Sequence, residues 1–188
     1  MKILGIAVHK TAFSLLLILL WAFAASAPAP AQALKAGEGA AARKGASGLP
    51  LPRFVSLKSN RVNLRKGPSL DHPIAWEFKR VGLPVEVVAE FENWRRIRYS
   101  DGTEGWVFHS LLSGRRTGVV TPWAGQGETT PLYDRPSTSG EVIARLAPGV
   151  LGSLMRCDGS WCKFSLDSVS GWIEQVKLWG VYKNEVIE

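Results

Sequence analysis

From residue 53 onward, short apolar runs alternate with glycine, proline, asparagine and aspartate. Residues 84–87 alternate in polarity, residues 94–99 follow a turn at Asn93, and residues 105–107 follow another turn. No window carries apolar residues at a helical period over three turns, which argues against helices. Several brief strands at this spacing predict a small all-β barrel or sandwich.

The first 33 residues have the pattern of a secretory signal peptide. After a mildly basic start, an uncharged apolar stretch runs from Leu15 to Ala25. This stretch is shorter than the roughly 20 residues of a membrane-spanning helix, but it suits a signal core. Small-x-small sites end at Ala27 and Ala33, and Pro28 after the first site favours cleavage after Ala33. We expect a periplasmic protein without stable membrane insertion after cleavage; a retained N-terminal anchor is the alternative.

The rest of the chain divides into a linker and two repeats. Residues 34–52 are rich in alanine, glycine and lysine without a sustained apolar period, which predicts a flexible linker. Four landmarks then recur at offsets of 68, 67, 67 and 66 residues: Pro68 and Pro136, Gly82 and Gly149, Trp94 and Trp161, and Trp106 and Trp172. This repeat predicts two domains, residues 53–116 and 117–188.

Four motifs of the first repeat follow one another in the order typical of a known family. They are VNLRKGPS at 62–69, PVEV at 84–87, WRRI at 94–97 and DGTEGWV at 101–107. Their order and spacing resemble a bacterial SH3 (SH3b) domain. The whole chain is similar to tandem exported SH3-like proteins of Gram-negative bacteria, which end in Trp-Gly-Val-Tyr, here residues 179–182. The resemblance implies two tandem small SH3-like β-barrels, each of about five or six strands, and a binding role in the cell envelope.

The second repeat departs from the family pattern at its polar positions. Aligned on the prolines, it replaces three motif residues and keeps one: Asn63 becomes Pro131, Arg65 becomes Tyr133, Gly67 becomes Arg135, and Leu64 is retained as Leu132. The apolar strand position therefore survives while the polar motif is lost. For this reason we expect the first domain to carry any ligand role of the motif.

Cys157 and Cys162 flank a four-residue turn between two expected strands. Cross-strand neighbours in this position are close enough for a disulfide, which an oxidising compartment would favour. Such a short loop would stabilise the hairpin by only ~2 kcal/mol. Two buried free thiols or a redox-active pair are the alternatives. At an offset of 67 the equivalent residues are Glu90 and Arg95, which we expect to pair as acid and base.

The sequence contains no recognisable catalytic, metal or phosphate-binding motif. Neither His72 nor His109 has a serine, cysteine or carboxylate at the spacing of a triad, and neither G-x-S-x-G nor H-E-x-x-H occurs. A Cys162–His109 pair would require the disulfide to be absent. At 188 residues, two such domains leave no room for a peptidase. We therefore expect a non-catalytic protein without a metal or cofactor.

Positive charge in the first domain and aromatic residues without a like residue in the other repeat point to a ligand groove. Residues 53–116 hold 12 basic and 7 acidic residues, whereas residues 117–188 hold 6 and 8. A positive surface attracts carboxylates, such as those of peptidoglycan stems or acidic proteins. Aromatic side chains of a shallow groove can pack against an extended peptide or a sugar ring. The candidate ligand-binding residues are Arg65, Trp76, Trp94, Arg98, Tyr99, Trp123 and Tyr133.

These observations predict non-covalent recognition of peptidoglycan or its stem peptides in the periplasm. The alternative is an adaptor that holds an envelope enzyme or signalling protein through an extended peptide. A thiol hydrolase or redox protein that uses Cys157 or Cys162 is a minor alternative. Nucleic acid is not expected as a partner because the protein is expected to be exported.

Overall fold

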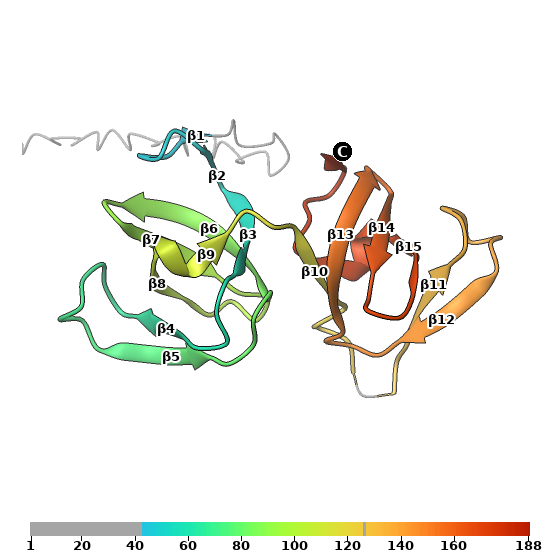
Figure 1. The fold of residues 1–188 in the computed structure, drawn as a ribbon, viewed down its shortest axis with the longest axis horizontal. Helices are drawn as coiled ribbons and strands as arrows, with labels where there is room; N and C mark the ends of the chain where they lie inside the picture. Colours follow the sequence, from blue (N-terminus) through green and yellow to red (C-terminus); the bar gives the residue numbers. More distant parts are fainter. Residues whose placement is uncertain (1–42, 126) are drawn as a thin grey trace, which may run out of the picture. The chain divides into compact units, whose positions relative to one another are not determined.

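The computed structural model describes residues 43–125 and 127–188, and the fold is all-β (Figure 1). The expected signal peptide and the first part of the expected linker lie outside the described residues. Two larger sheets account for most of the strands, and a short hairpin precedes them. Within the described ranges, no helix has the length and apolar character needed to cross a membrane.

The first large sheet runs from Arg53 to Ser113 and has the strand order β5-β4-β8-β7-β6-β3-β9. Its strands are β3 (Arg53–Leu57), β4 (Val62–Arg65), β5 (Ile74–Phe78), β6 (Pro84–Phe91), β7 (Trp94–Arg98), β8 (Glu104–Phe108) and β9 (Leu112–Ser113). All neighbouring strands are antiparallel. A 3₁₀ turn, η1 (His109–Leu111), joins β8 to β9.

The second large sheet repeats this topology with the order β12-β11-β15-β14-β13-β10-β16. Its strands are β10 (Thr117–Val120), β11 (Thr130–Tyr133), β12 (Val142–Leu146), β13 (Leu151–Asp158), β14 (Trp161–Ser165), β15 (Ser170–Glu174) and β16 (Leu178–Trp179), with η2 (Gln175–Lys177) before β16 and β17 (Val186–Ile187) beside β13. Both sheets shift register at equivalent points, after Leu64 and after Leu132. The tandem repeat expected from the sequence is therefore confirmed.

Neither sheet closes into a barrel, which corrects one detail of the expected fold. In each, the path of paired strands begins at one edge, β5 or β12, and ends at another, β9 or β16, without returning. Strand twist explains how each open sheet still encloses a core, since it brings alternate side chains together on the concave face. In β4, for example, Val62 and Leu64 are fully buried, whereas the residues that alternate with them are partly exposed.

Each sheet encloses its own apolar core, and residues of the second sheet also pack against the first core. Leu57, Val85 and Ile97 are among the buried residues of the first core, and Val119 of β10 packs with them. Phe164 is the largest fully buried side chain of the second core. Burial of each such side chain stabilises the fold by about 1.5–3 kcal/mol. The two sheets therefore share apolar contacts as well as a chain connection.

Residues 43–51 differ from the expected flexible linker. They form the hairpin of β1 (Arg43–Lys44) and β2 (Pro50–Leu51), in which Arg43 is paired with Leu51. Leu51 packs against the first core, and Ser47 at the tip bonds to Glu90 of β6. Composition alone predicted flexibility because these residues lack an apolar period, but the packing of Leu51 and the bonds from Ser47 hold the hairpin against the first sheet.

Candidate functional site

The segment that begins with Trp179, the last residue of β16, packs from the second sheet onto the first. The indole Nε1 of Trp179 donates to the carbonyl oxygen of Pro84 at 3.0 Å. Phe54 of β3 makes an edge-to-face contact with Trp179 at 5.1 Å between ring centroids, and a tilted contact with Tyr182 at 4.6 Å. Aromatic pairs in this distance range contribute about 0.5–1.5 kcal/mol beyond their buried area. The Trp-Gly-Val-Tyr segment therefore packs on the first sheet.

A buried carboxylate fixes the position of Tyr182. The hydroxyl of Tyr182 donates to Oε1 of Glu86 at 2.9 Å, and Arg98 donates to Oε2 through Nε at 2.9 Å and Nη2 at 2.6 Å. Glu86 is only 4% exposed. Burial raises the pKa of Tyr182 above its ordinary value, and the charge of Glu86 raises it further. Hydrogen bonding to Glu86 raises the pKa of Arg98.

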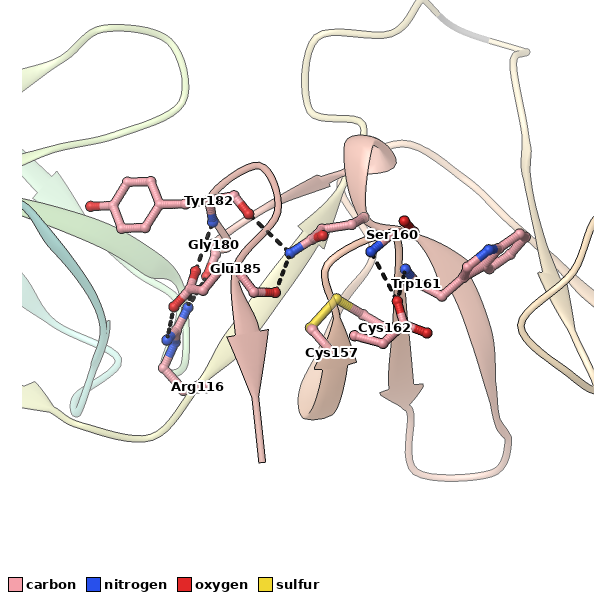
Figure 2. The surroundings of a disulfide bond; sticks show 10 residues. Arg116, Cys157, Ser160, Trp161, Cys162, Gly180, Tyr182 and Glu185 are labelled. Atoms are coloured by element: carbon pink, nitrogen blue, oxygen red, sulfur yellow. Dashed lines mark hydrogen bonds and ion pairs between the residues drawn. A yellow bond between two sulfur atoms is a disulfide. The ribbon is translucent and has the colours of Figure 1, made fainter. Parts of the chain in front are cut away.

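The turn that follows Tyr182 is held by a second ion pair (Figure 2). Arg116 donates to both carboxylate oxygens of Glu185, at 2.6 and 3.1 Å, and to the carbonyl oxygen of Gly180 at 2.9 Å. The same carboxylate accepts the backbone N–H of Tyr182 at 2.7 Å. The buried amide of Gln175 donates to the carbonyl oxygens of Tyr182 and Glu185. The turn is thus bonded from both sides.

Gly180 makes this crossing possible. Its φ of 116° is a backbone conformation that other residues rarely adopt. A Cβ at this position would collide with the carbonyl oxygen of Thr117 and press against the ring of Pro84. Glycine is therefore required here by both conformation and space.

A second buried carboxylate, that of Glu90, holds the hairpin against the first sheet. Its carboxylate accepts bonds from the N–H of Ser47 at 2.7 Å, the Ser47 hydroxyl at 2.8 Å and Arg53 at 2.7 Å, and Arg95 lies 3.2 Å away. Burial would raise the pKa of Glu90, but the bonds from Ser47 and Arg53 and the charge of Arg95 outweigh it and hold the pKa at about 2. The expected Glu90–Arg95 pair is confirmed. It is also more buried than a surface pair, since the Glu90 side chain is 1% exposed.

These elements enclose a cavity of about 560 Å³, which we call the composite groove. It is lined by Ser47, Leu49, Pro50, Pro52, Arg53, Phe54, Val55, Arg95, His109, Leu112, Ser113, Gly114, Arg116, Tyr182 and Glu185. The hairpin, the first sheet and the C-terminal turn each contribute to it. Its lining combines proline and aromatic surface with three arginines and one glutamate. Arg53 and Arg95 share the single Glu90 carboxylate, so the groove keeps a net positive charge that suits an extended ligand with carboxylates.

The arginines of the groove are held in place before any ligand binds. Arg53 bonds to Glu90 and to the Pro50 carbonyl oxygen, which occupies only part of its five N–H donors. Arg95 bonds to Glu90 and to the carbonyl oxygens of Glu92 and Trp94. Such preorganised donors lose little conformational entropy when they bind an anion.

None of the seven residues expected from the sequence lines the composite groove. Arg98 is linked to the groove through Glu86, which it shares with Tyr182. Arg65 instead bonds to the carbonyl oxygens of Leu70 and His72 and so fixes the loop between β4 and β5.

The aromatic candidates are spread over both sheets. Trp94 is buried against Phe108, and Tyr99 packs edge-to-face on Phe78. Tyr133 packs on Trp161 in the second sheet. Trp76 and Trp123 are well exposed, on β5 and in the turn after β10 respectively. The structure therefore does not gather these residues into one groove. Their proposed ligand role remains a prediction.

The two cysteines form the expected disulfide (Figure 2). Cys157 and Cys162 are direct partners in the β13–β14 ladder, with Cα atoms 4.1 Å apart, and both are buried. In the turn between them, Asp158 accepts the N–H groups of Trp161 and Ser160 at 2.8 and 2.9 Å, and these bonds lower the pKa of Asp158. No cysteine is free, so a thiol hydrolase that uses either one is not supported. Among the described residues, no group of His, Cys, Asp and Glu could hold a metal ion.

Comparison with known proteins supports both repeats. A family model described as a bacterial SH3 domain matches residues 58–114 and 126–180. The chain is 29% identical over 124 residues to the putative N-acetylmuramoyl-L-alanine amidase YrvJ of Bacillus subtilis (strain 168). That alignment covers 62% of this chain and 24% of the relative, so the chain spans about a quarter of the relative's length.

Two solved structures show weaker similarity. NlpC1 from Trichomonas vaginalis is 15% identical with a TM-score of 0.31, over 76% of this chain and 51% of that one. An NlpC/P60 family protein from Bacillus cereus ATCC 10987 is 14% identical with a TM-score of 0.30, over 66% and 55%. TM-scores this low support no argument about function.

Proposed function

Because the chain belongs to the bacterial SH3 domain family, we propose that it is a non-catalytic periplasmic protein that binds peptidoglycan stem peptides in the composite groove. The observation that carries the proposal is the lining of the groove, where three arginines flank proline and aromatic surface. A stem peptide is extended and carries free carboxylates. It therefore matches this lining in both shape and charge.

Similarity to YrvJ supports the same assignment. The alignment reaches only 24% of that putative amidase, and this chain contains no recognisable catalytic motif. We therefore infer that the shared part serves binding, with any cleavage left to a separate enzyme. Export to the periplasm, which the apolar stretch near the N-terminus predicts, would bring the groove to its ligand.

Sedimentation with purified sacculi tests the proposal. Leu49 and His109 line the groove and are exposed, so alanine at both should weaken binding without disturbing the cores. We expect the double variant to lose at least about tenfold in affinity. Val176→Ala provides a matched control, because Val176 is 64% exposed and lies outside the groove. Moderate salt should weaken binding by the native protein, since ionic contacts at an open surface are screened.

Three results would contradict the proposal. Equal binding by the double variant and the control would exclude the groove as the site. Release of soluble fragments from sacculi by the purified protein would show catalysis rather than simple binding. Failure to sediment, together with capture of a protein from envelope extract through the groove, would favour the adaptor alternative.

A further inference from the structure

The first sheet ends in an exposed strand. β5 is the last strand in its sheet, and no strand of residues 43–125 or 127–188 pairs with its outer edge. All residues from Leu70 to Trp76 are exposed. Leu70, Ile74 and Trp76 are 73%, 50% and 58% exposed, so three large apolar side chains gather in seven residues. Apolar side chains beside an open strand edge are typical of sites where another strand can add.

The backbone at this edge is held ready for pairing. On its inner side, Ile74 pairs with Arg65 and Trp76 pairs with Leu64 of β4. The loop before the strand is fixed by Arg65, which bonds to the carbonyl oxygens of Leu70 and His72 at 3.0 and 2.7 Å. Because β5 is fixed on one side, an incoming strand would not have to order it. The entropy cost of strand addition is correspondingly low.

Charge distinguishes this edge from its counterpart in the second repeat. Residues 58–80, which contain β4 and β5, hold six basic and two acidic residues, whereas the equivalent residues 125–147 hold two and three. The counterpart strand β12 is also a sheet edge, and its Val142 and Ile143 are 39% and 40% exposed. The two repeats thus present similar apolar edges in opposite electrostatic surroundings.

The cations around β5 leave the edge net positive. Glu77 on β5 is shared between Arg61 at 3.2 Å and Lys79 at 3.8 Å, so one carboxylate faces two cations. Lys66 is exposed beside the strand, and its backbone N–H bonds to the carbonyl oxygen of Pro73. A second copy of this chain would bring the same positive charge to the edge and would be repelled. An acidic partner would be attracted.

We propose that this edge binds an acidic, extended segment of a protein partner. The β5 edge surface consists of Leu70, Ile74 and Trp76 with Lys66 and Lys79 at its rim. The segment adds to β5 as a further strand, its backbone pairs with the open edge, and its carboxylates lie near the lysines. This surface is separate from the composite groove, since none of its residues lines that groove. The protein could therefore bind a peptidoglycan stem peptide and a protein partner at the same time.

Labelled peptides of about six residues provide the test. The probe alternates glutamate and valine, one comparison peptide alternates lysine and valine, and another carries N-methyl groups at alternate positions of the glutamate–valine probe. We expect the probe to bind and to slow amide hydrogen exchange within residues 74–78, and both comparison peptides to bind at least about tenfold more weakly.

Two variants locate the site. Trp76→Ala should weaken probe binding at least about tenfold, whereas Ile143→Ala, which truncates an exposed residue of the counterpart edge β12, should leave it unchanged. Leu49→Ala in the composite groove should also leave it unchanged, so failure here and failure of the proposed wall-binding function can be told apart. Thermal unfolding of each variant should confirm that the fold is intact.

Several outcomes would overturn the proposal. These are no binding of the probe, equal binding of the lysine–valine peptide, insensitivity to N-methylation, or an equal loss in Ile143→Ala. A dimer in sedimentation that Trp76→Ala dissociates would instead assign the edge to a second copy of this chain.

Discussion

Glu90→Gln should destabilise the fold at neutral pH and should lose most of this effect in acid. Glutamine keeps the size of the side chain and one acceptor oxygen. It leaves the guanidinium groups of Arg53 and Arg95, which lie 2.7 and 3.2 Å from the Glu90 carboxylate, without a counter-charge. It also weakens the bonds that Ser47 donates from the tip of the hairpin.

The size of the effect follows from the pKa of Glu90, which the fold lowers from 4.5 to about 2. A carboxyl with a depressed pKa contributes stability above its unfolded value, here above pH 4.5, and loses it as the pH falls toward 2. One pH unit corresponds to about 1.4 kcal/mol, so the full contribution is roughly 3–4 kcal/mol. At pH 3 less than about half of it should remain.

Urea unfolding of the native protein and of Glu90→Gln, measured near pH 7, 5 and 3, tests this expectation. The difference in unfolding free energy should be largest at the two higher pH values and should shrink at the lowest. Glu77→Gln is the matched control, because its partners Arg61 and Lys79 are exposed and such pairs contribute less than about 1 kcal/mol. A difference for Glu90→Gln that stays constant with pH, or one no larger than the control, would refute the reasoning.

Three further predictions concern the fold that supports the groove. Tyr182→Phe removes a hydrogen bond to the buried Glu86 carboxylate and should lower the free energy of unfolding in urea by about 1.5 kcal/mol. An unchanged midpoint would show that this bond does not stabilise the fold. Gly105→Ala would press a methyl group against the Arg65 carbonyl oxygen and should lower the free energy of unfolding by about 1–3 kcal/mol, measured by urea unfolding. Gly102→Ala is the comparison, because Gly102 has a positive φ but open space around it. Reduction of the disulfide should cost about 2 kcal/mol and leave unfolding cooperative, and loss of all near-ultraviolet circular dichroism would contradict this.

The repeat and the strand content could be predicted from the sequence because both depend on local pattern. Alternating apolar positions such as Val62 and Leu64 are buried as expected, and the landmark tryptophans fall in equivalent strands. Closure of the sheets could not be predicted in this way, since it depends on whether the two edge strands meet. The disulfide and the Glu90–Arg95 pair could be predicted, because cross-strand neighbours follow directly from the register of one hairpin.

The composite groove could not be predicted from the sequence. Its walls come from the hairpin, from η1 and from the turn at Tyr182, which are far apart in the chain. Alignment of the two repeats also failed to show that an arginine fixes the equivalent loop in each of them. Arg65 has no arginine at the equivalent position of the second repeat, but Arg135, two residues later, bonds to the carbonyl oxygen of Ser139 in the equivalent loop. In the alignment the arginine therefore looks lost from the second repeat, because it fixes the loop from a position two residues later.

The second repeat supports the composite groove of the first. A unit of about 60 residues buries only about 60% of the surface of its unfolded chain and is marginally stable alone. Val119 of β10 adds to the first core. Tyr182 lines the groove with its hydroxyl bonded to Glu86 of the first sheet and its backbone N–H bonded to Glu185 of the same C-terminal turn. Two carboxylates therefore hold this residue, one through its hydroxyl and one through its backbone. The proposed binding groove therefore depends on the C-terminal turn of the second repeat, although this repeat lacks the polar motif.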